Sequence, residues 1–194
     1  MPFRSTAPAG LTTDTFVLRP ITAADAEPDH AAVMESRELL RVWEQSTWPT
    51  DDFTVADNRA DLAELELRHA EGRAFTYTVL DPAGSECLGC VYLMPPDASM
   101  YDGARITPVG EHRWAEHDAA VYFWVRTSRL AAGTDRALLT ALRDWIARDW
   151  DLGPHVFVTH EQLTRQVALL ADAGLQLRFT VEEADKPGRY LAFG

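Results

Sequence analysis

The order of predicted elements indicates an α/β (α+β) protein with one mixed sheet and helices on both faces of that sheet. Residues 119–150 give the clearest signal, because a buried strand, a turn of small residues around Gly133 and an amphipathic helix follow one another there. The whole chain runs in the order strand, helices, two strands, strand, helix, strand, helix, two strands. This order predicts a sheet whose two faces are both covered by helices.

Periodicity and turn residues define the elements. Alternating apolar residues predict strands, apolar residues spaced three and four apart predict helices, and Pro or Gly marks their ends. Pro28 lies too deep for an unbroken helix, so a kink or a restart is expected near Asp29. The predicted elements are a strand at 13–20, a helical region that ends near 44, a helix at 55–71, strands at 75–79, 87–94 and 119–125, a helix after 133, a strand at 155–159, a helix that ends at 174, and a hairpin of 175–181 with 190–193.

More specific predictions can be made for two of the helices. Thr159 and Gln162 have the spacing of a capping box, which predicts that they open the last helix. Gly174 fits a left-handed cap at the end of that helix. The helix at 55–71 is expected to turn Leu62, Leu65 and Leu67 inward and its acidic residues largely outward.

Residues 95–118 form a long polar segment that is rich in turn-forming residues and contains Tyr101 and Trp114. Loops of this length in a compact domain are usually functional or disordered. The segment is therefore expected to be either a lid over a pocket or a floppy insertion. The chain as a whole, residues 1–194, is expected to form a single domain with an inserted loop at about 95–118.

Charge and composition limit the function classes. The 194 residues include 18 Lys+Arg and 30 Asp+Glu, a net charge of −12, which argues against nucleic acid or an anionic membrane as a general partner. The acidity is compatible with a cationic amine substrate, although acidity alone usually serves solubility. The chain offers no apolar run of about 18 residues for a membrane span and no apolar core of a secretory signal near its start. A cytoplasmic location is expected.

Cys87 and Cys90 have the C-x-x-C spacing of redox and zinc motifs. The flanking residues are typical of a strand, however, and residues three apart in a strand point to opposite faces. No second cysteine pair completes a zinc site, and His112 and His117 are five apart, off the helical step for paired ligands. Two ordinary buried thiols and no metal site are therefore expected.

The chain resembles the GNAT N-acetyltransferase superfamily. The resemblance covers nearly the whole chain, from FVLRPITAADA through the unit at 119–150 to ADAGLQLRF. It implies a mostly antiparallel sheet with a splay between two central strands, where the pantetheine arm of acetyl-CoA lies. It also implies that acetyl-CoA is the co-substrate and that its diphosphate sits on the loop that leads into the helix after 133, where small residues let backbone amides converge on an anion.

The family motif on that loop, Q/R-x-x-G-x-G/A, falls on Leu130 to Asp135. Gly133 matches the first glycine, whereas Leu130 stands where Gln or Arg is expected and Asp135 where a small residue is expected. A carboxylate about 5 Å from a phosphate costs roughly 3 kcal/mol at an effective dielectric constant near 20. The alternative is that Asp135 caps or charges the start of the helix. The resemblance gives as cofactor-binding candidates Trp124, Val125, Arg126, Arg129, Gly133, Thr134 and Arg136.

The second family signature, on the last helix, keeps Gly174 but has Leu163 in the place of an asparagine and Leu170 in the place of a tyrosine that often protonates the leaving thiolate. The family's general base is commonly a glutamate on the central strand or nearby. Other residues must then be considered for acid–base chemistry or for a merely structural role: Asp118 and Glu116 at the start of the strand, Tyr122 on it, Tyr92 on its neighbour, and Glu44 as a wall residue.

Two main functions follow from the resemblance. The first is an acetyl-CoA-dependent N-acyltransferase that transfers an acetyl group to a small amine by direct attack within a ternary complex. The alternative is a GNAT-like protein without acetyltransferase activity that serves as a small-molecule-binding or interaction module. An unrelated α/β protein that only imitates the order of elements is a third interpretation. The final hairpin and the segment 95–118 are possible homodimer surfaces.

Overall fold

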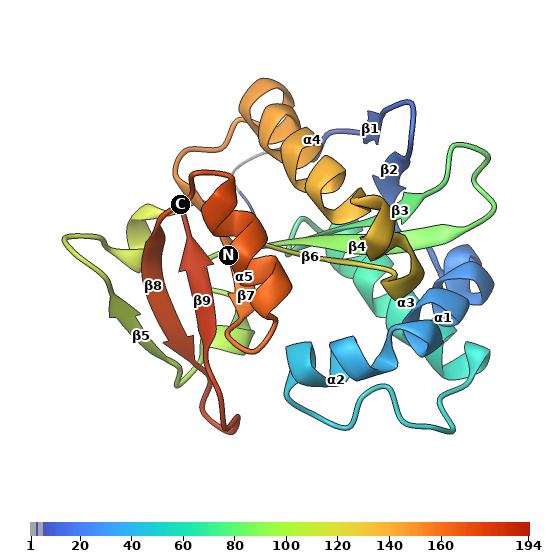
Figure 1. Ribbon diagram of the computed structural model, residues 1–194, viewed down its shortest axis with the longest axis horizontal. Coiled ribbons are helices and arrows are strands. Elements are labelled where there is room, and N and C mark those ends of the chain that lie inside the picture. The colour runs from blue at the N-terminus through green and yellow to red at the C-terminus, as the bar shows by residue number, and fades with distance from the viewer. Residues whose placement is uncertain (1–2, 4–5) are drawn as a thin grey trace.

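A nine-stranded mixed sheet runs through the described part of the chain, residue 3 and residues 6–194 of a computed structural model (Figure 1). The strands lie in the order β1-β2-β3-β4-β6-β7-β9-β8-β5, and every neighbouring pair is antiparallel except β6 and β7, which are parallel. The strands are β1 Leu11–Thr12, β2 Val17–Pro20, β3 Phe75–Leu80, β4 Cys87–Met94, β5 Arg105–Pro108, β6 Ala119–Val125, β7 His155–His160, β8 Leu177–Glu182 and β9 Tyr190–Phe193.

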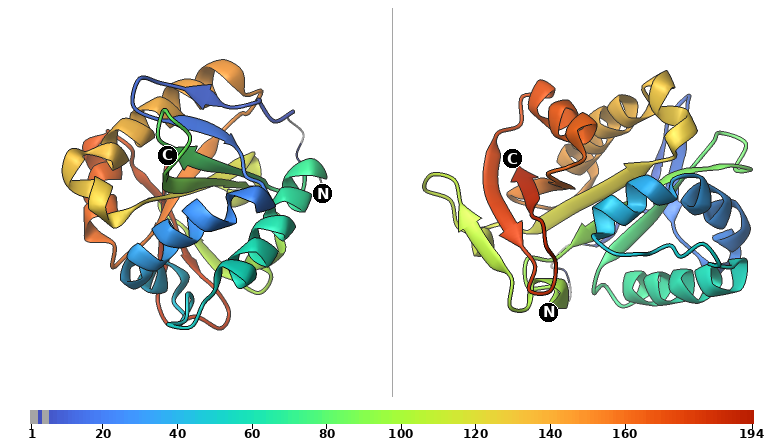
Figure 2. Two further views of the ribbon diagram at one scale, coloured as in Figure 1. Left: turned by 90° about the vertical axis from the view of Figure 1, so that its right-hand side faces the viewer. Right: turned by 60° about the horizontal axis from the view of Figure 1, so that its bottom comes forward.

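Helices cover both faces of the sheet, as predicted (Figures 1 and 2). One face carries α1 Ala26–Glu35, α2 Arg37–Glu44 and α3 Val55–Ala70, and the other carries α4 Thr134–Asp149 and α5 Thr164–Asp172. Strand β6 is buried along its whole length, and its residues alternate between the two cores. Val121, Phe123 and Val125 face α4, whereas Tyr122 and Trp124 face the side of α1 and α2. The α/β (α+β) prediction is confirmed.

The parallel strands β6 and β7 diverge after a short shared stretch. They pair only at Ala119–His155, Ala120–Val156 and Val121–Phe157, and beyond this point β6 pairs with β4 alone while β7 pairs with β9. The remaining length of β6, from 122 to 125, therefore presents one backbone edge to a gap between the strands. The splay implied by the family resemblance is confirmed.

The first helical region breaks elsewhere than predicted. Helix α1 begins at Ala26, so Pro28 lies in its first turn, where a proline is tolerated because the amides there have no acceptor within the helix. The chain instead breaks at Ser36, between α1 and α2. The expected kink or restart near Asp29 is wrong.

The predicted capping box at Thr159 and Gln162 is also wrong. Helix α5 begins at Thr164, and Thr159 belongs to β7, where its hydroxyl donates to Gln166 Oε1 at 2.7 Å. The other end of α5 is as predicted, because Gly174 adopts the left-handed conformation with φ 81°.

Helix α3 has the predicted extent but a narrower buried face. Leu62 is buried, whereas Leu67 is 47% exposed. Residues five apart on a helix differ by about 140° in direction, so the two side chains cannot share one face. The prediction for Leu67 is therefore wrong.

The segment 95–118 is ordered. It supplies β5, which pairs with β8 at the edge of the sheet, and it buries Tyr101. The Trp114 ring lies 5.4 Å from the Phe179 ring, and its Nε1 donates to the Pro96 carbonyl at 2.9 Å. The alternative of a floppy insertion is wrong, and the segment extends the sheet.

Cys87 and Cys90 are free buried thiols, as predicted, but the argument that placed them on opposite faces is wrong. Both lie in the core beneath α1, because a bulge shifts the pairing of β3 with β4 between Val79 and Leu80. Gly89, with φ 154°, lies in this bulge, and a Cβ there would come within 2.1 Å of the Trp124 carbonyl oxygen. Burial raises the pKa of both thiols.

Among the described residues, no helix combines the length and the apolar character required to cross a bilayer.

Candidate active site

The gap between β6 and β7 contains a cavity of about 240 Å³. Its floor is the free edge of β6, and α5 and the loop before α4 close it from one side. The walls are largely apolar, and the residues that line the cavity are Leu39, Phe123, Trp124, Val125, Leu130, Asp135, Gln162, Leu163, Thr164, Arg165 and Gln166. A narrow, mostly apolar slot with an unpaired strand edge suits an extended, amide-containing chain.

Gln166 connects the two diverging strands. Its Nε2 donates to the Phe123 carbonyl of β6 at 2.8 Å, and its Oε1 accepts from the Thr159 hydroxyl of β7 at 2.7 Å. The side-chain amide therefore satisfies a backbone acceptor that strand pairing leaves free. Gln166 was not singled out from the sequence, because only the register of β6 and β7 shows that Phe123 needs a donor.

The loop after β6 ends in a tight turn at Gly133. A 3₁₀ segment, Thr127–Ala132, leads to Gly133, which has φ 76°, and α4 starts at Thr134. This left-handed conformation favours glycine. A Cβ built at Gly133 would meet no atom within 4 Å, so there is open space beside the turn. One of the first amides of α4, that of Arg136, already donates to Asp135 Oδ1 at 3.0 Å. A helix start with open space before it can accommodate an anion.

Asp135 lies beside this helix start and forms an ion pair with Arg165 of α5. Arg165 Nε lies 2.6 Å and Nη2 lies 3.1 Å from the two oxygens of the carboxylate, and Nη2 also donates to the Leu130 carbonyl at 2.6 Å. Asp135 is buried, whereas the Arg165 side chain is 56% exposed. The negative charge that the sequence places in the loop is thus balanced by a cation from another helix.

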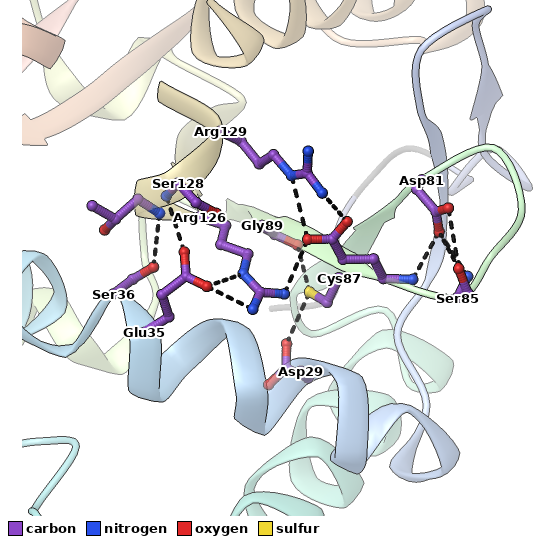
Figure 3. A network of polar contacts seen from close by, with 12 residues as sticks. Asp29, Glu35, Ser36, Asp81, Ser85, Cys87, Gly89, Arg126, Ser128 and Arg129 are labelled. Atoms are coloured by element: carbon purple, nitrogen blue, oxygen red, sulfur yellow. Dashed lines mark hydrogen bonds and ion pairs between the residues drawn. The ribbon is translucent and has the colours of Figure 1, made fainter. Parts of the chain in front are cut away.

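Arg126 and Arg129 are engaged by carboxylates of the protein itself (Figure 3). Arg126 pairs with Glu35 at 2.6 Å and with Glu86 at 3.2 Å, and Arg129 also pairs with Glu86. Glu35 in addition accepts from the Ser128 amide at 3.0 Å. Its hydrogen bond to Arg126 lowers the pKa of Glu35 to about 2. These contacts fasten the loop to the end of α1.

The remaining basic candidate, Arg136, is exposed on the first turn of α4 and lies 3.7 Å from the exposed Asp172. Thr134 is the first residue of the same helix. Of the predicted cofactor-binding residues, the structure therefore places Trp124 and Val125 in the gap and Gly133, Thr134 and Arg136 at the helix start.

A second cavity, of about 380 Å³, lies on the α2 side of the sheet. Aromatic rings form much of its wall: Trp43 lies 5.6 Å from Tyr92 and 6.2 Å from Tyr122, and Tyr122 lies 6.5 Å from Tyr190. The two cavities adjoin along α2, because Leu39 lines the gap and Trp43, one turn later, lines the aromatic cavity. They also adjoin along one face of β6, where Tyr122 lines the aromatic cavity and Trp124 lines the gap.

The aromatic cavity is rich in charge. Glu44, Asp61, Glu64 and Glu183 line it together with Arg68 and Lys186. Arg68 pairs with Glu64 at 2.7 Å, and Lys186 pairs with Glu183 at 3.0 Å and with Glu44 at 3.7 Å. Burial raises the pKa of Glu44 in spite of its pairing with Lys186. A carboxyl group that holds a proton more readily than usual is suited to accept one from a substrate.

The hydroxyl of Tyr122 points into a buried hydrogen bond of 2.8 Å with the hydroxyl of Tyr101. Burial raises the pKa of both phenols, so both keep their protons at neutral pH. Tyr92 also lines the cavity and accepts from Trp124 Nε1 at 3.3 Å. Tyr101 was overlooked as a partner of Tyr122 because its pairing depends on how 95–118 folds back on β6.

The structure does not bring the predicted acids of the strand start to these cavities. Asp118 precedes β6 at the end opposite Val125, and its Oδ2 accepts from the Gly153 amide at 2.7 Å. Glu116 is exposed and lies 3.7 Å from Arg113. Leu170, in the place of the family's tyrosine, is fully buried in the core beneath α4. Glu44 and Tyr122, by contrast, share one cavity.

Within the described residues, no group of three His, Cys, Asp or Glu side chains is arranged to hold a metal ion.

The splayed parallel pair, the glycine turn into α4 and the flanking helices define the fold of the GNAT acetyltransferases, and the resemblance is confirmed at this level. Solved structures with this fold superpose over almost the whole chain. The ribosomal-protein-S5-alanine acetyltransferase from Vibrio fischeri has a TM-score of 0.67 and 17% sequence identity, with 96% of this chain and 95% of that chain covered. RimJ of Mycobacterium smegmatis, solved with a CoA disulfide, has a TM-score of 0.67 and 20% identity over 100% of this chain and 84% of its own.

The microcin C7 self-immunity acetyltransferase MccE, solved with acetyl-CoA and AMP, has a TM-score of 0.70 and 12% identity, with 96% of each chain covered. No family model matches the sequence, and no curated protein matches it. At these identities the likeness establishes the fold.

Proposed function

We propose that this protein is an acetyl-CoA-dependent N-acetyltransferase that transfers the acetyl group to a small amine by direct attack in a ternary complex. The observation that carries the proposal is the divergence of β6 and β7 beyond Val121, which opens an apolar slot directly next to a glycine turn and a helix start. Three solved proteins of the same fold are described as acetyltransferases, and two of these structures contain CoA or acetyl-CoA.

The residues present suit acetyl-CoA at both ends of the slot. On the edge of β6 between Tyr122 and Val125, Gln166 occupies the Phe123 carbonyl, and the other backbone groups facing the gap are offered to the amides of the pantetheine arm. Leu39 and Leu163 supply apolar walls. The start of α4 would hold the diphosphate, since Gly133 leaves room beside it and the exposed Arg136 would supply positive charge. Pairing with Arg165 removes the repulsion that Asp135 alone would exert on this anion.

The transfer needs a base for the amine and an acid for the leaving thiolate. Glu44 takes the proton of the attacking ammonium, since burial raises its pKa toward the range that general bases use. The amine then attacks the thioester carbonyl, and the Tyr122–Tyr101 hydroxyl pair supplies the proton for the sulfur. Positioning of the amine beside the thioester contributes much of the rate enhancement.

The acceptor is inferred to be a small cationic amine that enters the aromatic cavity. Aromatic faces and carboxylates both attract ammonium groups, and this cavity combines Trp43, Tyr122 and Tyr190 with Glu44 and Glu183. The ribosomal-protein acetyltransferases of this fold suggest a terminal amine of a protein as the other acceptor class. Polyamines and aromatic amines should therefore be screened beside peptides with free amino termini.

Calorimetric titration with acetyl-CoA tests the co-substrate directly. Binding at micromolar concentration and release of free CoA in the presence of an amine are expected. Saturating acetyl-CoA should also raise the melting temperature by mass action. Absence of any binding at millimolar acetyl-CoA would exclude the proposed function.

A second function, a GNAT-like binding module without transferase activity, is favoured by one observation. Arg126 and Arg129, which the motif offers for an anion, are occupied by Glu35 and Glu86. If the protein is such a binding module, the native chain does not bind CoA, and the double substitution Leu130→Arg with Asp135→Gly creates CoA binding. Native binding at micromolar concentration would exclude it.

A further inference from the structure

The aromatic cavity contains the only lysine of the chain. Among 18 Lys+Arg residues, Lys186 is the single lysine, and it lies in the turn between β8 and β9. Arginine remains protonated in proteins and is a poor acyl acceptor, whereas a lysine amine can lose its proton and attack a carbonyl. The one side-chain amine of this protein thus lines the cavity to which the proposed function assigns the amine acceptor.

The position of Lys186 resembles that expected of a bound substrate ammonium. Its Nζ lies 3.0 Å from Glu183, 3.7 Å from Glu44 and 5.9 Å from the centre of the Tyr190 ring. Its side chain is 28% exposed. Carboxylates and an aromatic face are the groups that recognise a cationic amine, so Lys186 already uses the contacts that an acceptor would need.

A short series of contacts joins Lys186 to the gap. The Tyr190 ring beneath its ammonium lies 6.5 Å from the Tyr122 ring, and Trp124, the next residue on the same face of β6, lines the gap. The Tyr190 hydroxyl donates to the Trp43 carbonyl at 2.7 Å, which fixes this ring against α2. The flexible four-carbon stem of a lysine can carry its amine along this wall toward the gap.

We propose that Lys186 is a self-acetylation site: its amine accepts the acetyl group from acetyl-CoA bound in the gap of the same chain. This inference rests on the proposed function. The Lys186 ammonium gives one proton to Glu44, and the free amine attacks the thioester carbonyl. The N–C bond forms, the C–S bond breaks, and the second amine proton ends on the sulfur of CoA. The products are acetyl-Lys186 and free CoA, with no change of oxidation state.

Acetylation replaces the cation between Glu44 and Glu183 with a neutral amide. Glu183 Oε1 is already buried without a hydrogen-bond partner among the described residues, so the ion pair with Lys186 is its main compensation. The modified cavity is more negative by one charge, and a cationic ligand should bind there more strongly.

The main test is to incubate the purified protein with acetyl-CoA and to map acetylation by peptide mass spectrometry. One acetyl group on the peptide that contains Lys186 is expected, with a first-order rate that does not depend on protein concentration. The same chain unfolded in urea measures purely chemical acetylation and should react far more slowly. A rate that rises in proportion to protein concentration would contradict transfer within one chain.

Two variants sharpen this test. Lys186→Arg keeps the positive charge and should remove the modification while acetyl-CoA still binds. Glu44→Gln should slow modification about a hundredfold, the usual loss on removal of a general base, without weakening acetyl-CoA binding. Wild-type chain that binds acetyl-CoA but leaves Lys186 unmodified overturns the inference alone. Absence of acetyl-CoA binding overturns the proposed function, and this inference with it.

A second readout does not depend on catalysis. Protein grown with lysine labelled with carbon-13 at the ε position should give one side-chain signal from Lys186 in a nuclear magnetic resonance spectrum. Addition of free CoA should shift that signal, because the thiol end of the pantetheine arm comes to lie beside the amine. CoA binding without any shift would show that Lys186 lies too far from the gap.

Discussion

Arg165 and Asp135 form a two-point ion pair across the mouth of the gap between β6 and β7. The guanidinium comes from α5 and the carboxylate from the first turn of α4, so the pair joins the two helices that cover this face of the sheet. From the sequence motif alone, the Asp135 carboxylate is expected to repel an anion bound at the start of α4. The ion pair changes that expectation, because the local charge becomes close to neutral.

This pair leads to a prediction for CoA affinity. Arg165→Ala leaves the buried Asp135 carboxylate unpaired and should weaken CoA binding about a hundredfold, since a like charge about 5 Å away costs roughly 3 kcal/mol. The double variant Arg165→Ala with Asp135→Ala should recover most of this loss. Calorimetry with CoA and with pantetheine, which lacks the diphosphate, is the measurement. An equal loss for pantetheine would mean that the pair shapes the gap and does not act on the anion.

Gln166 should stabilise the protein, because its side chain bonds to both β6 and β7 where these strands diverge. Gln166→Leu removes the donor to the Phe123 carbonyl and the acceptor of the Thr159 hydroxyl, and leaving such groups unsatisfied costs about 1–3 kcal/mol. Urea unfolding should show a decrease of this size in the free energy of unfolding. Gln176→Leu, at an exposed position after α5, is the matched control and should change it little. Equal effects of both substitutions would refute a stabilising role for the hydrogen bonds of the Gln166 side chain to β6 and β7.

Tyr122 should matter for turnover and not for co-substrate binding. Tyr122→Phe removes the hydroxyl that pairs with Tyr101 and should reduce kcat about tenfold to a hundredfold with any amine acceptor found by screening. The dissociation constant of CoA should stay within about twofold, since the phenyl ring still packs on Trp43. Tyr101→Phe should have a smaller effect, because it leaves the Tyr122 hydroxyl in place. An unchanged kcat in Tyr122→Phe would exclude the hydroxyl as the proton donor.

Stability should depend on pH through Glu35. The pKa of Glu35 falls from an ordinary 4.5 to about 2 in the folded chain, with the hydrogen bond to Arg126 as the largest cause. A carboxyl group whose folded pKa is lowered stabilises the protein above its unfolded pKa, and this contribution disappears as the pH falls through the folded pKa. The contribution of Glu35 should therefore be complete above about pH 4.5 and vanish near pH 2.

Glu35→Gln measures this contribution. The variant should unfold more easily than the wild type at neutral pH by about 1 kcal/mol, a typical upper value for a solvent-accessible pair, and the difference should close as the pH approaches 2. Denaturant titrations at several pH values are the measurement. Glu38→Gln on α2, where the side chain is 81% exposed, is the control. A constant difference across this pH range would mean that the charge of Glu35 is not involved.

The two cysteines should be chemically silent in the folded protein. Both are buried with raised pKa, so neither presents a thiolate at neutral pH. A thiol-reactive dye should label neither in the native state and both in urea. Rapid labelling of the native protein would mean that the core beneath α1 opens on the timescale of the reaction.

The sequence by itself determined the fold class and the order of the elements except β1 and β5, which it did not predict. Strands β3, β4, β6 and β9 and helix α3 follow from local periodicity, because one buried face imposes a period of two or 3.6 on the residues. The divergence of two central strands was predicted from the family resemblance and not from local periodicity. Pro28 and Thr159 were misinterpreted because a proline in a first turn and a threonine in a strand are locally indistinguishable from a kink and a cap.

Only the tertiary structure decided how the charges of the site combine. Arg165 is 30 residues from Asp135, Arg126 is 91 residues from Glu35, and Lys186 is 142 residues from Glu44, so no local pattern links them. Coulomb interactions depend on distance in space, and that distance is set by how α2, α5 and the β8–β9 turn pack against the sheet. The sequence therefore showed that Asp135 lies where the motif loop meets the helix and that Lys186 is the only lysine. The packing showed which charged groups lie beside each of them.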